Sequence, residues 1–338
     1  MGRRFPSGLC ALLFSFATLC PSGTWAEEAP QAYEIIARPI AEFRIGSSEA
    51  RFGPLEFIGG LEMTSRNRAF GGLSSFRFLD AGRRFVGVAD TGLWFFGALS
   101  HDAGGRPEGI DTFTMEPIQD LDGNVSGEKW TTDAEAIAVE GDRVTVGFER
   151  DHRIAEFRLM PEAMGAATGE VDFLVPDYEL RTNRGFETVA HAPEDSAFAG
   201  ARVAVTERSI DTRGNVFAAI LEGPLKGVFT VARSDNYDIT DGAFLPNGDL
   251  LLLERRFSMA SGIAMRLRRI SAASIRPGSV ADGPVLLEAD MSYQIDNMEA
   301  LDVWRRGADG ALIVSLLSDD NHSILQRNLY LEFRLHGE

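Results

Sequence analysis

The feature that most constrains the fold is a β-hairpin that recurs along the chain. Its clearest copy, residues 133–150, holds two runs of alternating apolar residues, 134–139 and 144–148. A turn containing Gly and Asp joins the runs, which is typical of a β-hairpin. Glu135 begins the first strand and Glu149 ends the second. Antiparallel pairing therefore predicts that both carboxylates lie at the same end of the hairpin.

Four other segments repeat this hairpin, opening near Phe70, Phe186, Asp241 and Met298, at intervals of about 50 to 60 residues. The intervals leave room for two further strands in most units, and four strands per unit are typical of a propeller blade. The sequence therefore predicts an all-β protein, a β-propeller with five blades. A β-sandwich, the alternative, would not require such regular recurrence.

The last repeat is one strand short, and the N-terminal region supplies a candidate for the missing strand. Residues 55–72, LEFIGGLEMTSRNRAFGG, echo residues 171–187, VDFLVPDYELRTNRGFE, which lead from one repeat into the next. We therefore expect the N-terminal strand, residues 55–64, to close the last blade. A sixth blade is the alternative if residues 40–45 and the long intervals hide another repeat.

The first 26 residues have the pattern of a signal peptide. Two arginines precede an apolar run, residues 9–19, and small residues precede Glu27. The run is too short to span a bilayer, which disfavours a transmembrane anchor. We expect cleavage after Ala26, a periplasmic or secreted protein with no membrane span, and a single domain over residues 27–338. The Sec and twin-arginine routes both stay open. Both cysteines lie in this leader, so the mature chain has no disulfide.

The charge of the chain limits its partners. Its formal net charge is −17, with a pI near 4.8. Such an acidic surface repels phosphate backbones and anionic lipids, so nucleic acid is not an expected partner. We expect a monomer that acts on a small-molecule ester or phosphoester.

Acidic residues recur where the first strand of a hairpin begins and where the second ends. The hairpin geometry predicts that they gather at one mouth of the central channel, where cations must compensate them. Ca²⁺, which takes six to eight oxygen ligands, or another divalent cation fits such a set, whereas the lack of cysteine and the few histidines disfavour zinc and iron. The alternative, which can coexist with a metal site, is that the acids form salt bridges between blades with Arg150, Arg208 and Arg255. The candidate metal ligands are Asp90, Glu135, Glu149, Glu187, Glu207, Asp241, Glu254, Glu299 and Asp319.

Several of these acids and their neighbours are also candidates for catalysis. A histidine titrates near neutral pH and can move a proton, although an ordinary loop histidine is an equal interpretation. An arginine can hold a phosphate or carboxylate with two hydrogen bonds. The catalytic candidates are Glu135, Glu187, His152, His322, Arg150 and Arg208.

The motifs of the chain resemble those of the phytase-like family, whose members are described as "esterase-like activity of phytase". They are FGGLSSF, DTG, DAEAIAV, FERDHRI, RGFETVA, TERS, DGAFLPNGDLLLLERRF, DNMEALDVW and SDDN, spread over residues 55–335. The resemblance implies an exported bacterial β-propeller related to calcium-dependent propeller phytases. Those enzymes hydrolyse phosphomonoesters with calcium ions that bridge the protein and the substrate phosphates. This chain departs from them in having only two lysines, Lys129 and Lys226.

Three functions are consistent with these observations. The first is a metal-dependent hydrolase of phosphate or carboxylate esters, in which a cation polarises the scissile group. The second is a lactonase or sugar-ester hydrolase on a propeller. The third is a non-catalytic module that binds an extracytoplasmic ligand or protein. Propellers support all three, so the fold does not decide between them.

Overall fold

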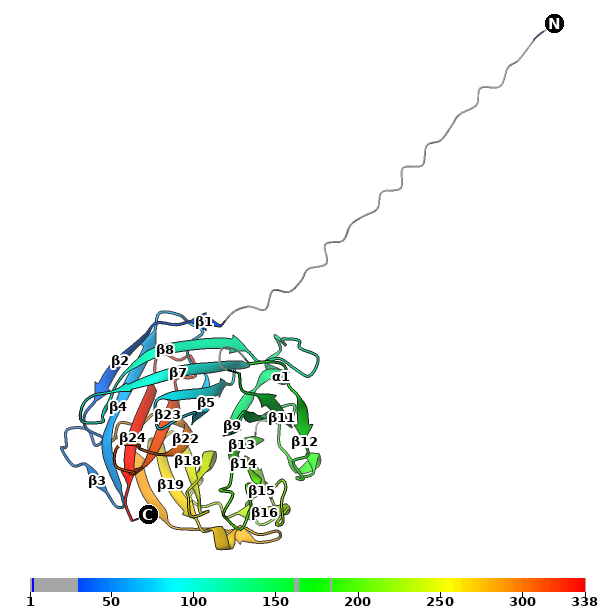
Figure 1. Cartoon of the computed structure of the whole chain (residues 1–338). Coiled ribbons are helices and arrows are strands. Elements are labelled where there is room, and N and C mark those ends of the chain that lie inside the picture. The colour runs from blue at the N-terminus through cyan, green and yellow to red at the C-terminus, as the bar shows by residue number, and fades with distance from the viewer. Residues whose placement is uncertain (1, 3–29, 161–163, 183, 338) are drawn as a thin grey trace.

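The chain folds into five sheets that surround a central axis, and their strands pair antiparallel except for one short parallel pair in the third sheet (Figure 1). This computed structural model describes residues 2, 30–160, 164–182 and 184–337. The predicted signal peptide, residues 1–26, lies outside the described residues apart from Gly2. Within the described part of the chain, no helix is long and apolar enough to cross a membrane.

The sheets follow one another in chain order, and the first strand of each hairpin is innermost. Blade 1 consists of β5 (Leu73–Phe78), β6 (Arg84–Ala89), β7 (Leu93–His101), β8 (Pro107–Pro117) and β1 (Gln31–Ala32). Blade 2 consists of β9 (Ala134–Glu140), β10 (Arg143–Phe148), β11 (Arg153–Arg158) and β12 (Gly169–Val171). Blade 3 consists of β13 (Phe186–His191), β14 (Arg202–Ile210), β15 (Val216–Ile220), β16 (Gly227–Val231) and β20 (Val280–Ala281).

The last two blades complete the ring. Blade 4 consists of β17 (Asp238–Phe244), β18 (Leu250–Ser258), β19 (Gly262–Ile270) and β21 (Val285–Asp290). Blade 5 consists of β22 (Asn297–Arg305), β23 (Leu312–Asp319), β24 (Asn328–Leu335), β4 (Leu55–Ser65) and β2 (Ile35–Ile40), with β3 (Arg51–Phe52) paired to β4. The helical segments are α1 (Lys129–Thr132), η1 (Asp177–Glu179) and η2 (Ala272–Ser274).

The prediction of a five-bladed propeller closed by an N-terminal strand is confirmed. The blue β4 lies beside the red β24 in Figure 1, and the two strands pair antiparallel from Leu55↔Leu335 to Met63↔Asn328. The inner strands β5, β9, β13, β17 and β22 each contact the inner strand of the next blade, which closes the ring. The region around residue 40 adds a fifth strand, β2, to blade 5 and does not form a sixth blade.

Apolar side chains fill the spaces between the blades. In the described residues they form five clusters, one for each pair of neighbouring blades. The cluster between blades 4 and 5 includes Leu253, Leu301 and Phe333, all fully buried. Burying one such side chain contributes about 1.5–3 kcal/mol. The side chains on the two faces of each sheet therefore hold the ring together without disulfides.

Each inner strand carries a β-bulge at the same place. The register between the first and second strands shifts by one residue in every blade, which leaves one residue of the inner strand without a partner. A bulge turns the side chain of its extra residue away from the regular alternation. The five bulge residues are Ser74, Glu135, Glu187, Thr240 and Glu299.

Candidate functional site

Seven acidic side chains line one mouth of the channel, and an eighth, Asp133, is buried beside them. The bulges of blades 2, 3 and 5 turn Glu135, Glu187 and Glu299 toward the mouth, and four other acids lie where the pairing of a second strand with its inner strand ends. They surround a pocket of about 280 Å³. The pocket is lined by Ser74, Asp90, Glu135, Glu149, Arg184, Glu187, Glu207, Arg255, Glu299, Asp319 and Asn321.

Blade 4 differs from the sequence-based expectation, which placed Asp241 and Glu254 at this mouth. The bulge residue of this blade is Thr240, so Asp241 lies one position further along the strand. In the same register Arg255, paired with Asp238, takes the place that acids occupy in the other blades. A shift of one residue reverses the face to which every side chain points. The placement of Asp241 and Glu254 at the mouth is therefore wrong.

Asp241 lies inside the channel, where Arg77 from blade 1 binds it. The two nitrogens Nη1 and Nη2 of Arg77 each donate to one oxygen of Asp241 at 2.9 Å. Arg77 also donates to the carbonyl oxygens of Gly242 at 3.0 Å and Leu301 at 2.8 Å. Asp241 is 0% exposed and Arg77 is 7% exposed. We call Arg77 and Asp241 the plug, because they fill the channel below the mouth.

Glu254 is also held by arginines away from the mouth. It is 1% exposed and accepts hydrogen bonds from Arg266 and, at 2.5 Å, from Nη2 of Arg268. Both arginines come from β19, the neighbouring strand of the same blade. Two cations therefore compensate this carboxylate, which leaves it no role at the mouth.

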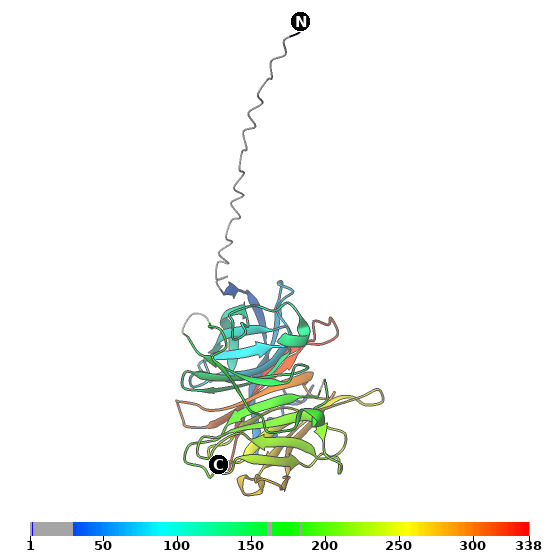
Figure 2. The same ribbon diagram turned by 90° about the vertical axis from the view of Figure 1, so that its right-hand side faces the viewer.

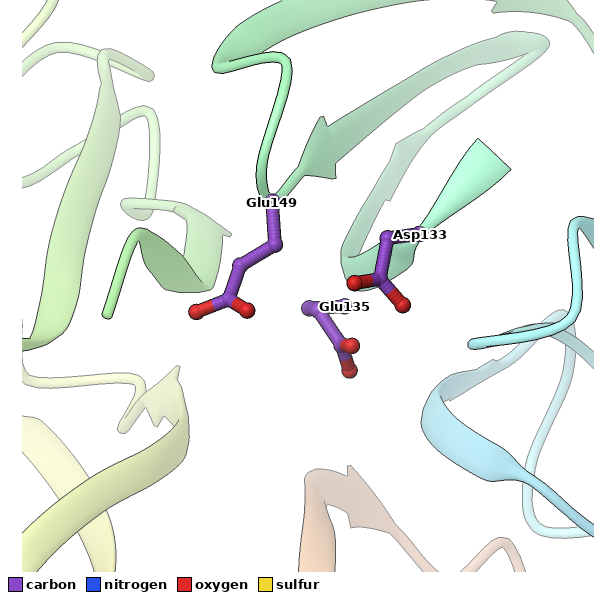
Figure 3. Close-up of side chains that lie close together, drawn as sticks. All are labelled: Asp133, Glu135 and Glu149. Carbon is purple, nitrogen blue, oxygen red and sulfur yellow. The ribbon is translucent and has the colours of Figure 1, made fainter. Parts of the chain in front are cut away.

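The acids of the mouth lie close enough together to share a cation. Ligand oxygens of Asp133, Glu135 and Glu149 lie within 4.8 Å of one another, and so do those of Glu149, Glu187 and Glu207. Figure 3 shows the first group, in which all three side chains come from the same end of one hairpin. Glu149 belongs to both groups, so two adjoining cation sites can share its carboxylate.

Burial and mutual repulsion raise the pKa values of these acids. Burial, and then the neighbouring Glu207 and Asp133, raise the pKa of Glu149 to about 7 against the hydrogen bond that the Gly185 N–H donates. Burial raises the pKa of Glu299 to about 8 despite the nearby Arg255. Burial followed by other carboxylates also holds the pKa values of Glu135 and Glu187 well above their usual range.

A few cations compensate the acids of the mouth in part. Arg255 lies 2.8 Å from Glu299 of blade 5 and 3.8 Å from Glu207 of blade 3, so it joins three blades. The ammonium of Lys129, on α1, lies 2.5 Å from Asp90 and 3.5 Å from Asp133. Of the three arginines for which the sequence suggested salt bridges between blades, Arg255 and Arg208 form them, whereas Arg150 pairs with Asp133 of its own hairpin.

The donor set fits a hard divalent cation. Every group that lines the two clusters is a carboxylate, the ligand that Ca²⁺ and similar ions prefer. The buried Oδ1 atoms of Asp90 and Asp133 accept no hydrogen bond in the described residues, although the Lys129 ammonium lies 3.5 Å from Oδ1 of Asp133. Such oxygens are costly to bury without a donor or a cation. The residues present therefore fit a divalent ion at the mouth.

The other predicted catalytic residues surround the mouth without lining it. Arg150 forms an ion pair with Asp133 of its own hairpin. Arg208 lies 3.5 Å from Asp238 in a neighbouring pocket. His322 is exposed and lies over Gly71 and Gly72, where an added Cβ would meet its ring.

His152 is half-buried and packs against Gly185, whose N–H binds Glu149. Its two ring nitrogens have no hydrogen-bond partner in the described part of the chain, and burial lowers its pKa. Gly185 therefore lies between His152 and Glu149, the nearest acid of the mouth along this contact.

Sequence reasoning missed Asp133, Arg255 as a member of the ring, and Lys129. Aligning the start of each inner strand on the bulge would have found Asp133. The aligned segments are GLSS (72–75), DAEA (133–136), GFET (185–188), DITD (238–241) and NMEA (297–300). This alignment places Asp133 beside Glu135 and makes Thr240 the counterpart of the glutamates. No pattern in the sequence marks Lys129, because it lies on the short helix α1, outside the repeated hairpins.

A five-bladed propeller with a carboxylate-lined mouth is the class of protein that the fold and the site define. The chain belongs to the phytase-like family, described as "esterase-like activity of phytase", whose model matches residues 68–322. The family that the sequence motifs indicated is thereby confirmed. No curated protein sequence matches the chain.

Two solved structures resemble the chain at low sequence identity. One is described as a putative oxidoreductase (glucose dehydrogenase) from Thermus thermophilus, with 12% identity and a TM-score of 0.40 over 82% of this chain and 99% of that one. The other is the glutaminyl cyclase of Myxococcus xanthus, with 12% identity and a TM-score of 0.41 over 84% of this chain and 97% of that one. At these scores neither likeness carries an argument about function.

Proposed function

We propose that the protein is an exported, divalent-cation-dependent hydrolase of phosphate or carboxylate esters that acts at the mouth of the channel. The observation that carries the proposal is the pair of buried carboxylate groups that share Glu149. Membership of a family described by an esterase-like activity supports the same reaction class. Export rests on the predicted signal peptide.

The residues that would hold the cation are those of the two groups, Asp133, Glu135, Glu149, Glu187 and Glu207. A bound Ca²⁺ or similar ion supplies the positive charge that polarises the ester and makes a nearby water easier to deprotonate. Arg77 of the plug reaches across the channel to carbonyl oxygens of blades 3, 4 and 5, so we expect substrate to enter and products to leave by the mouth.

The protein's own groups complete the chemistry. A carboxylate of the pocket that lies outside the two groups, such as Glu299, can accept a proton from the attacking water. Arg184 and Arg255 line the same pocket and can donate hydrogen bonds to the negative oxygen that forms during hydrolysis. His322 and His152, outside the pocket, are proposed only as groups that pass protons to solvent.

The test combines metal analysis with an ester panel. Mature protein is expected to retain a divalent ion and to hydrolyse p-nitrophenyl phosphate, or a p-nitrophenyl ester or lactone, only when the ion is present. Glu135→Gln and Glu187→Gln are expected to lower kcat/KM by about a hundredfold, whereas Glu108→Gln, an exposed glutamate on β8, leaves it unchanged. A protein that binds no divalent ion and hydrolyses none of these esters would be the non-catalytic binding module instead.

A further inference from the structure

A second pocket adjoins the mouth and has the opposite charge. It has a volume of about 810 Å³ and shares Arg184, Glu207 and Arg255 with the acidic pocket. Five arginines but only two carboxylates line it, although the chain as a whole has a net charge of −17. The arginines are Arg184, Arg208, Arg233, Arg255 and Arg256, and the carboxylates are Glu207 and Asp238.

The two carboxylates are already shared among four of the arginines. Glu207 lies 2.7 Å from Arg184 and 3.8 Å from Arg255. Asp238 lies 2.8 Å from Arg233 and 3.5 Å from Arg208. Arg255 is also paired with Glu299 of the mouth, at 2.8 Å. Because Arg184, Arg208 and Arg233 share only two carboxylates, they retain donors and positive charge that these pairs do not use.

Arg256 has no carboxylate partner in the described part of the chain. Its guanidinium lies 4.7 Å from the ring centre of Tyr237, and its Nη1 donates to the carbonyl oxygen of Asp235 at 3.5 Å. Its Nε is buried without a hydrogen-bond partner. A buried N–H without an acceptor costs free energy, and the guanidinium keeps a positive charge that no carboxylate neutralises and that an anionic ligand can pair with.

One wall of the pocket is apolar. The register of blade 4 pairs β18 with β17 only as far as Arg255, whereas β18 and β19 pair on to Ser258↔Gly262. The end of this hairpin therefore extends past the inner strand. The side view in Figure 2 shows hairpin ends that project beyond the sheets. It presents Phe257, which is 71% exposed, together with Ile263. An exposed aromatic residue beside arginines with unused donors suits a ligand with both apolar and anionic parts.

We propose that this pocket binds the anionic end of a small amphipathic acid, a phosphate or a carboxylate, whose apolar part lies on Phe257 and Ile263. Anion binding here does not depend on hydrolysis. The further statement, that this anionic group is part of the ester bound at the mouth, rests on the proposed function. On that basis the preferred substrates are esters with a second anionic group, because Arg184 and Arg255 line both pockets.

The test uses phenylphosphonate, which has an aromatic ring and cannot be hydrolysed as an ester, with benzoate and inorganic phosphate as further probes. Titration calorimetry on mature protein stripped of divalent cations over a chelating resin is expected to show saturable phenylphosphonate binding. Arg256→Gln and Arg208→Gln are expected to weaken it by about tenfold each. Arg305→Gln is the matched control, since Arg305 is an exposed arginine bonded to Gly310 beyond the opposite end of its hairpin.

Phe257→Ser is expected to weaken phenylphosphonate binding and leave phosphate binding unchanged. The absence of saturable binding up to about 10 mM, or equal affinity in wild type, Arg256→Gln and Arg208→Gln, would overturn the proposal. Benzoate binding with the same pattern of variants supports a carboxylate ligand, and phenylphosphonate binding alone supports a phosphate. Ca²⁺ titration of the same samples separates the two proposals. A protein that binds phenylphosphonate but no Ca²⁺ would contradict the proposed hydrolase and leave the anion pocket supported.

Discussion

The mouth and the plug both bury carboxylates on the axis of the propeller, but they compensate them in opposite ways. Asp241 in the plug faces both donor nitrogens of Arg77 and also accepts hydrogen bonds from Leu301 and Gly242. At the mouth, seven carboxylates share a few partial cation contacts. A compensated buried charge holds structure together, whereas an uncompensated group of charges is poised to bind a cation.

The largest expected effect comes from breaking the plug. Arg77→Met leaves Asp241 buried without its cation and is expected to lower the free energy of unfolding by about 3–5 kcal/mol, measured by urea denaturation. The double variant Arg77→Met with Asp241→Leu removes both charges and is expected to recover at least half of that loss. If the single variant were as stable as wild type, the plug would not be the structural ion pair described above.

The next effect is the dependence of stability on pH in protein stripped of divalent cations. The folded protein raises the pKa of Glu149 to about 7 and of Glu299 to about 8, above their usual value of 4.5. At pH values between 4.5 and the raised pKa values, the folded state therefore binds more protons than the unfolded state. Its stability falls as the pH rises from 5 to 8.

We expect this loss to be on the order of 3 kcal/mol, measured as urea denaturation at each pH. A saturating concentration of Ca²⁺ is expected to flatten the curve, because the ion replaces the lost protons. If stability stayed constant or rose between pH 5 and pH 8 without cations, the buried carboxylates of the mouth would not have the raised pKa values described above.

Neutralising one acid in each region is expected to give effects of opposite sign. In stripped protein at pH 8, Glu149→Gln removes a repelled charge but can still accept the N–H of Gly185, so it is expected to gain about 1–2 kcal/mol. Asp241→Asn is the matched variant in the plug, and it is expected to destabilise the protein. Thermal melting of both variants with and without Ca²⁺ measures the contrast, and Glu149→Gln is expected to lose the stabilisation that the ion gives wild type.

The smallest effect tests the equivalence of the five bulges. Ser74 is the bulge residue of blade 1 and lines the acidic pocket, so Ser74→Asp adds a carboxylate where the neighbouring blades carry one. Calorimetry is expected to show Ca²⁺ affinity raised by about threefold, less than 1 kcal/mol. Ser74→Asn, which has nearly the same shape and no charge, is the control and is expected to leave the affinity unchanged.

Much of the fold could be read from the sequence, and less of the site. The alternation of residues 134–139 and 144–148 and the echo of residues 171–187 in residues 55–72 predicted the hairpins and the closing strand correctly, because both depend on local pairing rules. Glu135 and Glu187 were placed at the mouth correctly for the same reason. Asp133 was missed because it precedes the first strand and lies outside the alternating pattern. Its neighbours Glu135 and Glu149 come from the ends of two different strands.

The repeat of the residue pattern predicted five blades and how the ring closes, and the structure removed the alternative of a sixth blade. The repeat also specifies that acids recur at one end of the hairpins, since side chains alternate with a period of two along any strand. Only the tertiary structure decided that the bulge of blade 4 leaves Thr240 unpaired. This register places Arg255 among the acids of the mouth and pairs Asp241 with Arg77. The physical reason is that a single extra residue reverses every side chain beyond it, and its position depends on packing against the next blade.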